Sequence, residues 1–416
     1  MISSGLAVRI SGALVGQLWL DADKRFCFQY DTAWLANSRI PLSLALPLRP
    51  EPYLADASHP FFTNLLPEER IRAAIARNLG ISTDNDYGLL ERLGGDCAGA
   101  VSLYPSTIAQ ETTGGSYQEL SEDELAVIID DLPRRPLLAG ESGIRLSLAG
   151  AQNKLPVHFD GNRFSLCHGA AASTHIIKPA IAGLDDSVVN EAYCMALARS
   201  IGLNVPRSFL FQAGAAPIFV VERYDRIIAD TDVSRLHQED FCQALGILPQ
   251  YKYEAEGGPT LVGCCDLLRR ASIRPGGDLL ALIDWVIYAV LTGNCDAHAK
   301  NISLLLLVDG PRLAPFYDLI STRIYAHYGL TDRLAMKIGG EADPTALRTQ
   351  HWQRFAEEIG VKPKLVLKRI SDMALRVEAQ RLQLFQGEFA RYHCDALYRL
   401  IQLIGEQAER VRKWVG

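Results

Sequence analysis

The chain has 416 residues, which at about 150 residues per domain predicts two or three compact units and excludes a mini-protein. Its 48% apolar and 22% charged residues are ordinary for a globular protein, so wholesale disorder is excluded as well. The 42 Lys and Arg against 48 Asp and Glu give a net charge of -6, which lacks the positive excess that non-specific nucleic-acid binding needs. Any DNA contact is therefore expected to be local or indirect.

The cysteines and the apolar segments indicate in which cellular compartment the protein is expected. Nine cysteines are an odd number without C-x-x-C spacing, which predicts a reduced, cytoplasmic protein without a structural zinc site. The N-terminal sequence MISSGLAVRISG lacks a basic segment followed by a long apolar one, so export is not expected. The most apolar helix candidate, residues 279–291, carries Asp284 and is shorter than the roughly 18 apolar residues of a membrane span. We interpret it as a buried core helix and expect no membrane partner.

The first predicted part, residues 1–110, mixes strands and helices. Its short alternating runs LAVRI, ALVGQLWL and RFCFQY predict an antiparallel meander. A helix follows in PEERIRAAIARNLG, with Pro67 at its first position and Gly80 as its terminator. Residues 111–140, with TTGGS, the acidic helix SEDELAVIIDDL and PRRP, change in composition and predict a connecting region.

The third predicted part, residues 141–228, contains strands around one helix. The runs KLPVHF and NRFSLC flank Asp160-Gly161, which is a strong hairpin signal. The strand HIIKP precedes a helix in SVVNEAYCMALARSIG with Ser187 as its N-cap, and IFVVERYDR returns to strand. The last part, residues 229–416, is predicted to be mainly helical, apart from a hairpin around Asp309-Gly310.

A small-residue loop, SLAGAQNK at residues 147–154, is the first candidate for chemistry. Small residues let backbone N–H groups approach phosphate oxygens, and Lys154 supplies a compact positive charge. The Walker phosphate-binding motif is absent. Taken alone, such a loop is more often an ordinary turn.

A lysine and a glutamate form the second candidate. Lys178 ends the strand HIIK, and Glu191 follows on the next helix, an order in which a kinase lysine is oriented toward the ATP phosphates. The alternative is a solvated lysine at a strand end and a surface glutamate.

Two polar segments surround the second predicted hairpin. In GNCDAHAKN, Asp296 and Asn301 have the D-x-x-x-x-N spacing of a kinase catalytic loop, in which the Asp accepts a hydroxyl proton and the Asn holds Mg²⁺. In FYDL, Asp318 stands at the far end of the hairpin, which returns it toward the first loop. Catalytic loop, hairpin and metal-binding Asp follow one another in the order found in kinases.

Together these segments resemble the HipA family of serine/threonine kinases, the toxins of bacterial HipBA toxin–antitoxin pairs. The resemblance rests on SLAGAQNKLPV, THIIKP, NEAYCMALARSIGLNVP, FVVERYDR, HQEDFCQALG, KYE with GGP, NCDAHAKN and PFYDLIS, and continues N-terminally through PLSLALPL, FFTNLLPE and GAVSLYP. It covers nearly the whole chain. It implies an α+β, bilobal protein-kinase-like fold with an N-terminal α/β subdomain and a mainly helical C-terminal lobe.

The resemblance also implies residue roles. Asp296 would be the catalytic base, Asn301 and Asp318 would hold Mg²⁺, His298 would lie near the γ-phosphate, and Ser147 would be autophosphorylated. The residues implied in ATP binding are Ala149, Gly150, Ala151, Gln152, Lys154 and Lys178 at the phosphates, and Glu222 and Tyr224 at the adenine hinge.

The function implied is a Mg²⁺/ATP-dependent protein kinase that acts as a toxin, with an aminoacyl-tRNA synthetase as its substrate. A HipB-like helix-turn-helix antitoxin would bind both the kinase and the operator DNA. Two alternatives stay open. A small-molecule kinase of similar fold is disfavoured by the N-terminal part and the HQEDFCQ and GGP segments. A catalytically inactive, antitoxin-binding co-repressor is disfavoured by the presence of Lys178, Asp296, Asn301 and Asp318.

Overall fold

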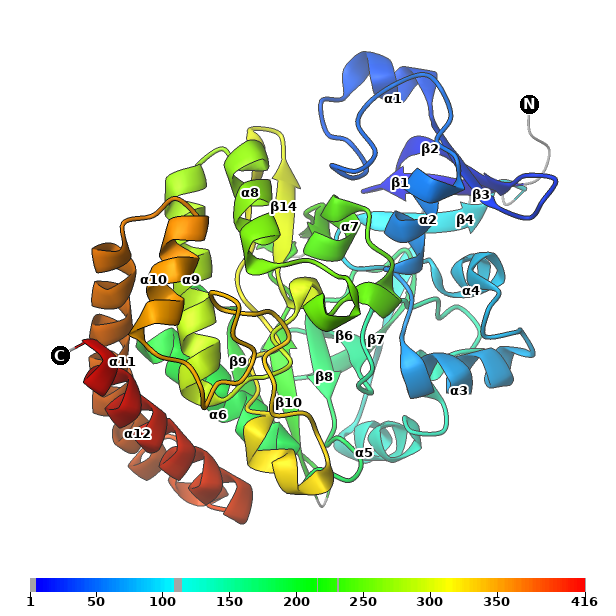
Figure 1. Ribbon diagram of the computed structural model, residues 1–416. Coiled ribbons are helices and arrows are strands. Elements are labelled where there is room, and N and C mark those ends of the chain that lie inside the picture. The colour runs from blue at the N-terminus through cyan, green and yellow to red at the C-terminus, as the bar shows by residue number, and fades with distance from the viewer. Residues whose placement is uncertain (1–4, 108–113, 215, 230–231, 416) are drawn as a thin grey trace. The chain divides into compact units, whose positions relative to one another are not determined.

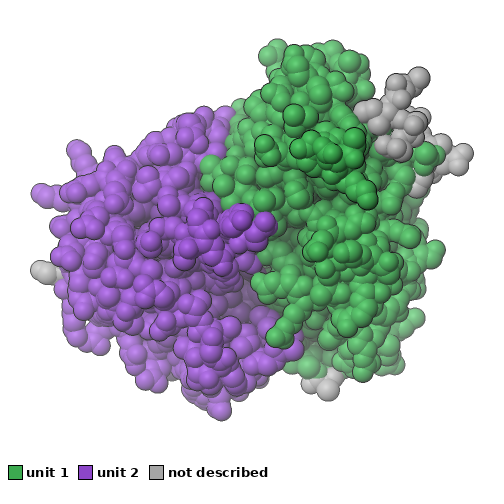
Figure 2. All heavy atoms as spheres, turned by 45° about the vertical axis from the view of Figure 1, so that its right-hand side comes forward, with its two compact units in different colours: residues 1–179, 211–249, 304–311 green, residues 180–210, 250–303, 312–416 purple. Residues whose placement is uncertain are grey.

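The computed structural model describes residues 5–107, 114–214, 216–229 and 232–415 (Figure 1). The chain divides into two compact units, drawn green and purple in Figure 2. Unit 1 consists of residues 1–179, 211–249 and 304–311, and unit 2 of residues 180–210, 250–303 and 312–416. Where the sequence suggested four consecutive parts, each unit is built from segments that are separated along the chain.

The N-terminal sheet of unit 1 is the expected meander. It has the order β3-β2-β1-β4, and its strands are β1 (Leu6–Ile10), β2 (Ala13–Leu20), β3 (Phe26–Tyr30) and β4 (Val101–Pro105). Alternate residues of β1 are buried, which is the period-2 pattern of a strand with one face on a core. The helices of this region are α1 (Thr32–Asn37), α2 (Ala55–Thr63), α3 (Glu69–Leu79) and α4 (Asp86–Leu93).

The ends of α3 confirm one prediction and correct another. Gly80 terminates the helix in the left-handed conformation, with φ +65°, as expected. Pro67 does not occupy the first helical position, because Glu68 is the N-cap and the helix begins at Glu69. The Pro67 backbone instead forms a parallel bridge with Gly150, so it is part of a loop contact.

A second sheet has the order β5-β7-β6-β8-β10-β9. Its strands are β5 (Gly115–Glu119), β6 (Leu155–Phe159), β7 (Phe164–Gly169), β8 (His175–Lys178), β9 (Ser208–Ala213) and β10 (Ala216–Glu222). The Asp160-Gly161 hairpin joins β6 to β7 as predicted, with the Asp160 carboxylate accepting the N–H groups of Asn162 and Arg163, each at 2.8 Å. Residues 111–140 are more than a connection, because β5 pairs with β7.

The remaining elements of unit 1 are short. Helix α5 (Glu122–Asp131) begins at a capping box of Ser121 and Glu124. Strands β11 (Arg226–Ala229) and β12 (Asp232–Arg235) form a hairpin, and α7 (Phe241–Leu245) follows β13 (Gln238–Asp240). A third sheet, β13-β14-β15, contains the second predicted hairpin, β14 (Ser303–Leu307) and β15 (Gly310–Leu313). Turns of 3₁₀ helix occur in unit 1 at Pro136–Leu138, at the boundary of its segment at Pro249–Tyr251, and in unit 2 at Glu254–Glu256, Ala299–Asn301, Arg323–Tyr328 and Ala390–Tyr392.

Unit 2 is built around a long apolar helix, α9 (Pro275–Thr292). It packs against α8 (Leu261–Ala271), α11 (Pro363–Gln386) and α12 (Asp395–Val415) (Figure 1). Length and composition alone would let α9 cross a membrane, yet 67% of it is buried inside the protein and Asp284 forms an ion pair with Arg369 of α11. The predicted core helix is confirmed. The other helices are α6 (Ser187–Ser200) and α10 (Thr349–Glu358).

The start of α6 corrects the predicted cap. Asp186, with φ +49°, is the N-cap, and Ser187 is the first helical residue. The buried Ser187 hydroxyl oxygen accepts the backbone N–H of Ile181 at 2.8 Å, so it closes the preceding loop. All nine cysteines are free thiols, and eight of them are buried.

Candidate active site

The buried helix α9 ends at a glycine, and a polar loop follows it. Gly293 ends α9 with φ +70°, and a Cβ atom there would lie 2.9 Å from Leu403 Cδ2. Its carbonyl oxygen accepts the backbone N–H groups of Thr322 and Arg323, at 3.1 and 3.0 Å. The loop after α9 is therefore joined at its first residue to the segment that follows Asp318.

Asp296 projects from this loop with its carboxylate accessible. The side chain is 45% exposed, and the Asp296 backbone N–H donates to the Asn294 side-chain oxygen at 3.1 Å. Asp296 Oδ1 accepts a hydrogen bond from the Tyr253 hydroxyl at 2.6 Å, and His298 Nε2 lies 3.9 Å from the same oxygen. An oriented carboxylate that a second molecule can reach is what a general base requires.

Asn301 and Asp318 lie together, as the hairpin predicted. Asn301 Nδ2 donates to Asp318 Oδ2 at 2.7 Å, and Asn301 Oδ1 accepts the backbone N–H of His298 at 3.3 Å. Asp318 has φ +59°, a backbone conformation that residues other than glycine rarely adopt and that is enriched at functional sites.

The donor set of this pair fits Mg²⁺. That ion prefers oxygen ligands and is bound through one or two carboxylates together with substrate phosphates and water. Asp318 supplies a carboxylate and Asn301 an amide oxygen. Among the described residues no three His, Cys, Asp or Glu side chains gather into a group that could hold a metal ion.

Neighbouring polar groups hold the segment that carries Asp318. On α6, the buried Asn190 side chain donates to the Ser321 carbonyl at 2.8 Å and accepts the Ser321 N–H at 3.0 Å. The Tyr317 hydroxyl donates to the Lys300 carbonyl at 2.6 Å. These contacts fix both sides of Asp318, and they explain why an asparagine stands in a fully buried helix turn.

The predicted phosphate loop lies in unit 1, between residue 147 and strand β6. Lys154 Nζ donates to the Ala149 carbonyl at 2.5 Å, and Gly150 has φ +107°, where a Cβ atom would lie 2.7 Å from that ammonium nitrogen. Gln152 Nε2 donates to the Pro179 carbonyl at 3.4 Å. The residues of this loop that are partly or fully exposed are Ala149, Gly150, Ala151, Gln152, Asn153 and Lys154. A cation is thus folded over a short, accessible backbone loop.

Ser147 is fully buried at the entrance to the loop. Its hydroxyl donates to the Leu65 carbonyl at 2.7 Å, and its backbone N–H donates to the Asp96 carbonyl at 3.0 Å. No kinase could reach this hydroxyl unless the loop first left that position.

Lys178 and Glu191 are both buried. Lys178, at the end of β8 in unit 1, is 6% exposed, and Glu191, on α6 in unit 2, is 2% exposed. The alternative of a solvated strand-end lysine and a surface glutamate is therefore wrong for both residues. Charged groups are rarely buried without a partner or a function.

The predicted adenine hinge follows β10. Glu222 pairs with His175 of β8 in the ladder, and the Tyr224 hydroxyl donates to the Gln238 side-chain oxygen. Burial lowers the pKa of His175 to about 4, so this histidine is neutral at physiological pH. The chain returns to unit 2 only after Pro249, so residues 222–249 belong to unit 1.

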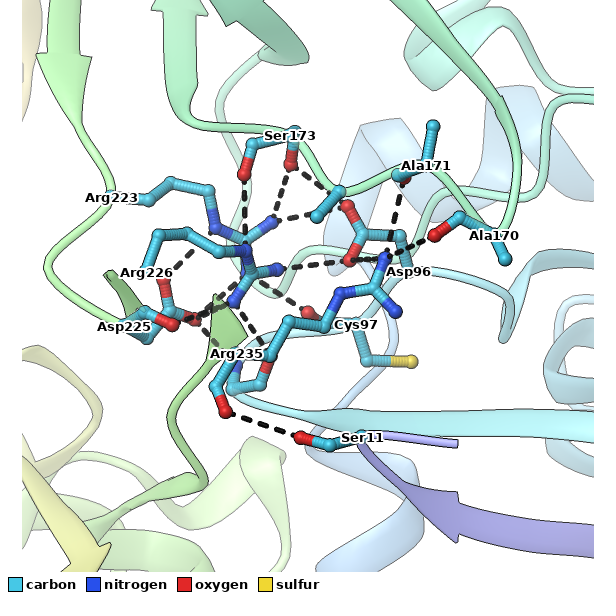
Figure 3. A network of polar contacts seen from close by, with 12 residues as sticks. Ser11, Asp96, Cys97, Ala170, Ala171, Ser173, Arg223, Asp225, Arg226 and Arg235 are labelled. Carbon is cyan, nitrogen blue, oxygen red and sulfur yellow. Dashed lines mark hydrogen bonds and ion pairs between the residues drawn. The ribbon is translucent and has the colours of Figure 1, made fainter. Parts of the chain in front are cut away.

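A buried network of charges holds the hinge (Figure 3). Asp96 forms ion pairs with Arg223, Arg226 and Arg235 at 3.3, 2.9 and 3.2 Å. Asp225 pairs with Arg223 at 2.8 Å and accepts the Gly99 N–H at 2.6 Å. Burial raises the pKa of Asp225, but its attraction to Arg223 and Arg226 outweighs this effect and holds the pKa at about 2. The network fixes the backbone on both sides of Tyr224.

Two protein-family models match this sequence. Residues 6–104 match the HipA N-terminal domain, and residues 146–381 match the HipA-like C-terminal domain. The chain belongs to the HipA family. The resemblance found in the sequence is thereby confirmed.

HipA relatives match the chain over most of its length. Y4mE of Sinorhizobium fredii is 46% identical over 372 residues, 87% of this chain and 87% of that protein. The serine/threonine-protein kinase toxin HipA of Shewanella oneidensis is 30% identical over 386 residues, 89% of this chain and 87% of that protein. A chain from the solved complex of HipA, HipB and operator DNA of Shewanella oneidensis MR-1 matches with a TM-score of 0.86 at 27% identity, covering 99% of this chain and 98% of that one. The α+β, kinase-like HipA fold is confirmed.

Three residues that support the candidate site were not predicted from the sequence. Tyr253, Asn190 and Asp96 contact or support the predicted residues, but none of them belongs to a motif with a known chemical role. Asn190 left a signal, because a polar residue within an otherwise buried helix must find a partner. Asp96 lies in none of the segments singled out in the sequence, and Tyr253 lies in KYE, a segment of the resemblance to which no chemical role was given.

Proposed function

We propose that this chain is a Mg²⁺/ATP-dependent protein serine/threonine kinase that acts as the toxin of a toxin–antitoxin pair. The observation that carries the proposal is the arrangement of Asp296, Asn301 and Asp318 in unit 2. An accessible, oriented carboxylate lies in the same short loop as an amide that is bonded to a second carboxylate. Phosphoryl transfer in kinases uses such a base and such a pair of metal ligands. The relative from Shewanella oneidensis is named a serine/threonine-protein kinase toxin, which supports the same function.

In this proposal each group of the chain has one task. Asp296 orients the substrate hydroxyl and accepts its proton as the new oxygen–phosphorus bond forms. Asn301 and Asp318 hold Mg²⁺, which neutralises charge on the phosphates when bound. Lys154 and Lys178 bind phosphate oxygens, and the backbone at 222–224 binds adenine. His298 stays beside the base, where it contacts the γ-phosphate.

The partners are proposed from the relatives. The solved complex contains HipB and operator DNA, which supports a HipB-like antitoxin for this chain. A net charge of -6 agrees with a DNA contact made mainly through that antitoxin. We propose an aminoacyl-tRNA synthetase as the phosphorylated protein, because arrest of translation would make the kinase a toxin.

Autophosphorylation at Ser147 would switch the enzyme off. A phosphate adds a charge of about -1.5 to -2, which cannot be accommodated where a fully buried hydroxyl donates to the Leu65 carbonyl. The modified loop would leave this position and remove Lys154 from the nucleotide. Because the hydroxyl becomes accessible only after the loop has moved, we expect slow modification.

Intact-mass measurement after incubation with Mg²⁺-ATP tests the proposal. Wild type should gain one phosphate, whereas Ser147→Ala should gain none and Asp296→Asn should gain almost none in the time that wild type needs for complete modification. Asp309→Asn, at the exposed hairpin tip, is the matched acid-to-amide control and should behave as wild type. Asp296→Asn should lower the rate about 10²- to 10⁴-fold with ATP binding intact, and Asp318→Ala and Asn301→Ala should lose Mg²⁺-dependent transfer.

Growth on overexpression supplies the second readout. Wild type should arrest growth and Asp296→Asn should not. Undiminished arrest by Asp296→Asn would overturn the kinase assignment and favour the inactive co-repressor.

A further inference from the structure

Tyr253 contacts both polar side chains of the catalytic loop that face it. Its hydroxyl donates to Asp296 Oδ1 at 2.6 Å, and its ring meets the His298 ring edge-on, with centroids 5.2 Å apart. The residue belongs to the segment KYEAEGGP, whose role the proposed function leaves unexplained.

Two glycines fold this segment back onto Tyr253. Gly257 has φ +88°, and the N–H of Gly258 donates to the Tyr253 carbonyl at 3.0 Å. A Cβ atom at Gly258 would lie 1.9 Å from the Tyr251 carbonyl oxygen and 2.7 Å from that of Tyr253, so no side chain fits there. The glycines of the motif thus set the backbone from which Tyr253 projects.

A ring of hydrogen bonds links this backbone to the catalytic loop. The Glu254 N–H donates to the Ala335 carbonyl at 3.1 Å, and the Ala335 N–H donates to the Cys295 carbonyl at 3.0 Å. The Glu254 carboxylate accepts the Lys337 N–H at 2.7 Å. These hydrogen bonds connect three segments, residues 253–254, 335–337 and 295–296. The hydrogen bond from Tyr253 to Asp296 closes the ring.

We propose that Tyr253 is a positioning residue that fixes the orientation of the Asp296 carboxylate for phosphoryl transfer. The inference rests on the proposed function and adds a residue to it. An ionised carboxylate has about four acceptor sites, so the bond from Tyr253 leaves room for the substrate hydroxyl. The 45% exposure of the Asp296 side chain shows that Tyr253 does not cover it.

The proton balance follows from this arrangement. The substrate hydroxyl gives its proton to Asp296 while its oxygen bonds to the γ-phosphorus and the bond from that phosphorus to the β-bridging oxygen breaks. Tyr253 keeps its own proton throughout and only holds the carboxylate. A bent or rotated carboxylate would lose alignment with the hydroxyl, which costs up to about a hundredfold in rate per ångström of displacement.

Tyr253→Phe tests the proposal, because it removes the hydroxyl and keeps the ring against His298. We expect kcat for ADP release from Mg²⁺-ATP, and for labelled phosphate entering the chain, to fall about 10- to 100-fold. The KM for ATP and the midpoint of thermal unfolding should stay unchanged. Tyr251→Phe removes the same atom from a side chain that is 47% exposed, and should leave all these quantities at wild-type values.

A double-mutant cycle with Asp296→Asn separates positioning from general damage. If Tyr253 acts through the base, Tyr253→Phe should cause no further loss once Asp296→Asn is present. Wild-type transfer with an equal or higher kcat in Tyr253→Phe would overturn the inference, and a higher kcat would mean that the hydroxyl blocks the substrate. Equal further losses in both backgrounds would overturn it too. Absence of transfer by wild type would instead overturn the proposed function.

Discussion

His237 shows how burial sets the charge of one side chain in unit 1. The residue precedes β13 and is 3% exposed, and its ring Nε2–H donates to the Leu42 carbonyl at 2.8 Å. Burial lowers the pKa of His237 to about 4, because a charged imidazolium would lose its hydration. The folded protein therefore favours the neutral ring.

This side chain predicts a loss of stability in mild acid. An unfolded histidine has a pKa of about 6.5, so the unfolded chain binds the proton first as the pH falls. The contribution of neutral His237 is complete above pH 6.5 and is lost toward pH 4, at about 1.4 kcal/mol per pH unit. His237→Gln should flatten this dependence between pH 7 and 5, measured by urea unfolding.

His175 titrates in the same direction, so part of the slope remains in that variant. His327→Gln, which changes an exposed ring, should keep the full wild-type slope. Equal slopes for wild type and His237→Gln would contradict the assignment.

At the scale of an element, the position of the catalytic loop depends on the left-handed backbone conformation of Gly293 at the end of α9. Its apolar body anchors the helix in the core of unit 2, and Gly293 then turns the chain where Leu403 and Arg323 leave no space for a side chain. The positions of Asp296 and Asn301 depend on this turn, since they follow it within a few residues.

Gly293→Ala should therefore damage both stability and transfer. A left-handed residue other than glycine costs about 1–3 kcal/mol, and the added methyl group would push the loop away from Leu403. Gly276→Ala in the first turn of α9 is the matched control, because nothing lies within 4 Å of its added Cβ and alanine favours a helix by about 0.5–1 kcal/mol. Chemical unfolding and phosphate incorporation measure the two effects. A Gly293→Ala enzyme with wild-type transfer would show that the turn does not set the loop.

Local sequence patterns predicted most of the helices and strands, but they did not predict contacts between residues that are distant in the sequence. The hairpins at Asp160-Gly161 and Asp309-Gly310 and the core helix α9 follow from periodicity and turn chemistry, which a short window of sequence contains. Order along the chain predicted that Asn301 and Asp318 meet. The bond from Tyr253 to Asp296 spans 43 positions, and nothing in either segment's periodicity specifies the other.

At the scale of the whole molecule, unit 1 depends on charges from distant parts of the chain. Asp96, from the region of the HipA N-terminal domain, is paired with Arg223, with Arg226 at the start of β11 and with Arg235 at the end of β12 (Figure 3). Removing one partner of a buried ion pair leaves an uncompensated charge, which costs about 3–5 kcal/mol. Such a loss is a large part of a typical folding free energy of about 5–15 kcal/mol.

A chain that starts at residue 114 should consequently fail to unfold cooperatively when it is followed by circular dichroism on heating. The point variant Asp96→Asn should lower the midpoint of the full chain, because Arg223, Arg226 and Arg235 lose their shared carboxylate. Asp23→Asn, at a largely exposed ion pair with Arg25, should leave the midpoint near that of wild type. A cooperative transition of the truncated chain at the wild-type temperature would contradict this dependence.

The interleaving of the two units also dictates when folding finishes on the ribosome. Strand β14 contributes residues 304–307 to unit 1, where the Leu306 N–H bonds to the His237 carbonyl, so the first unit stays incomplete until that strand has emerged. Unit 2 starts at residue 180 and is complete only with α12, which packs on α6 and α9. Domains usually fold one after another during synthesis, N-terminal first. Here the loop that carries Asp296 belongs to a unit whose packing is complete only once α12 has been made, so the two units finish folding late and not one before the other.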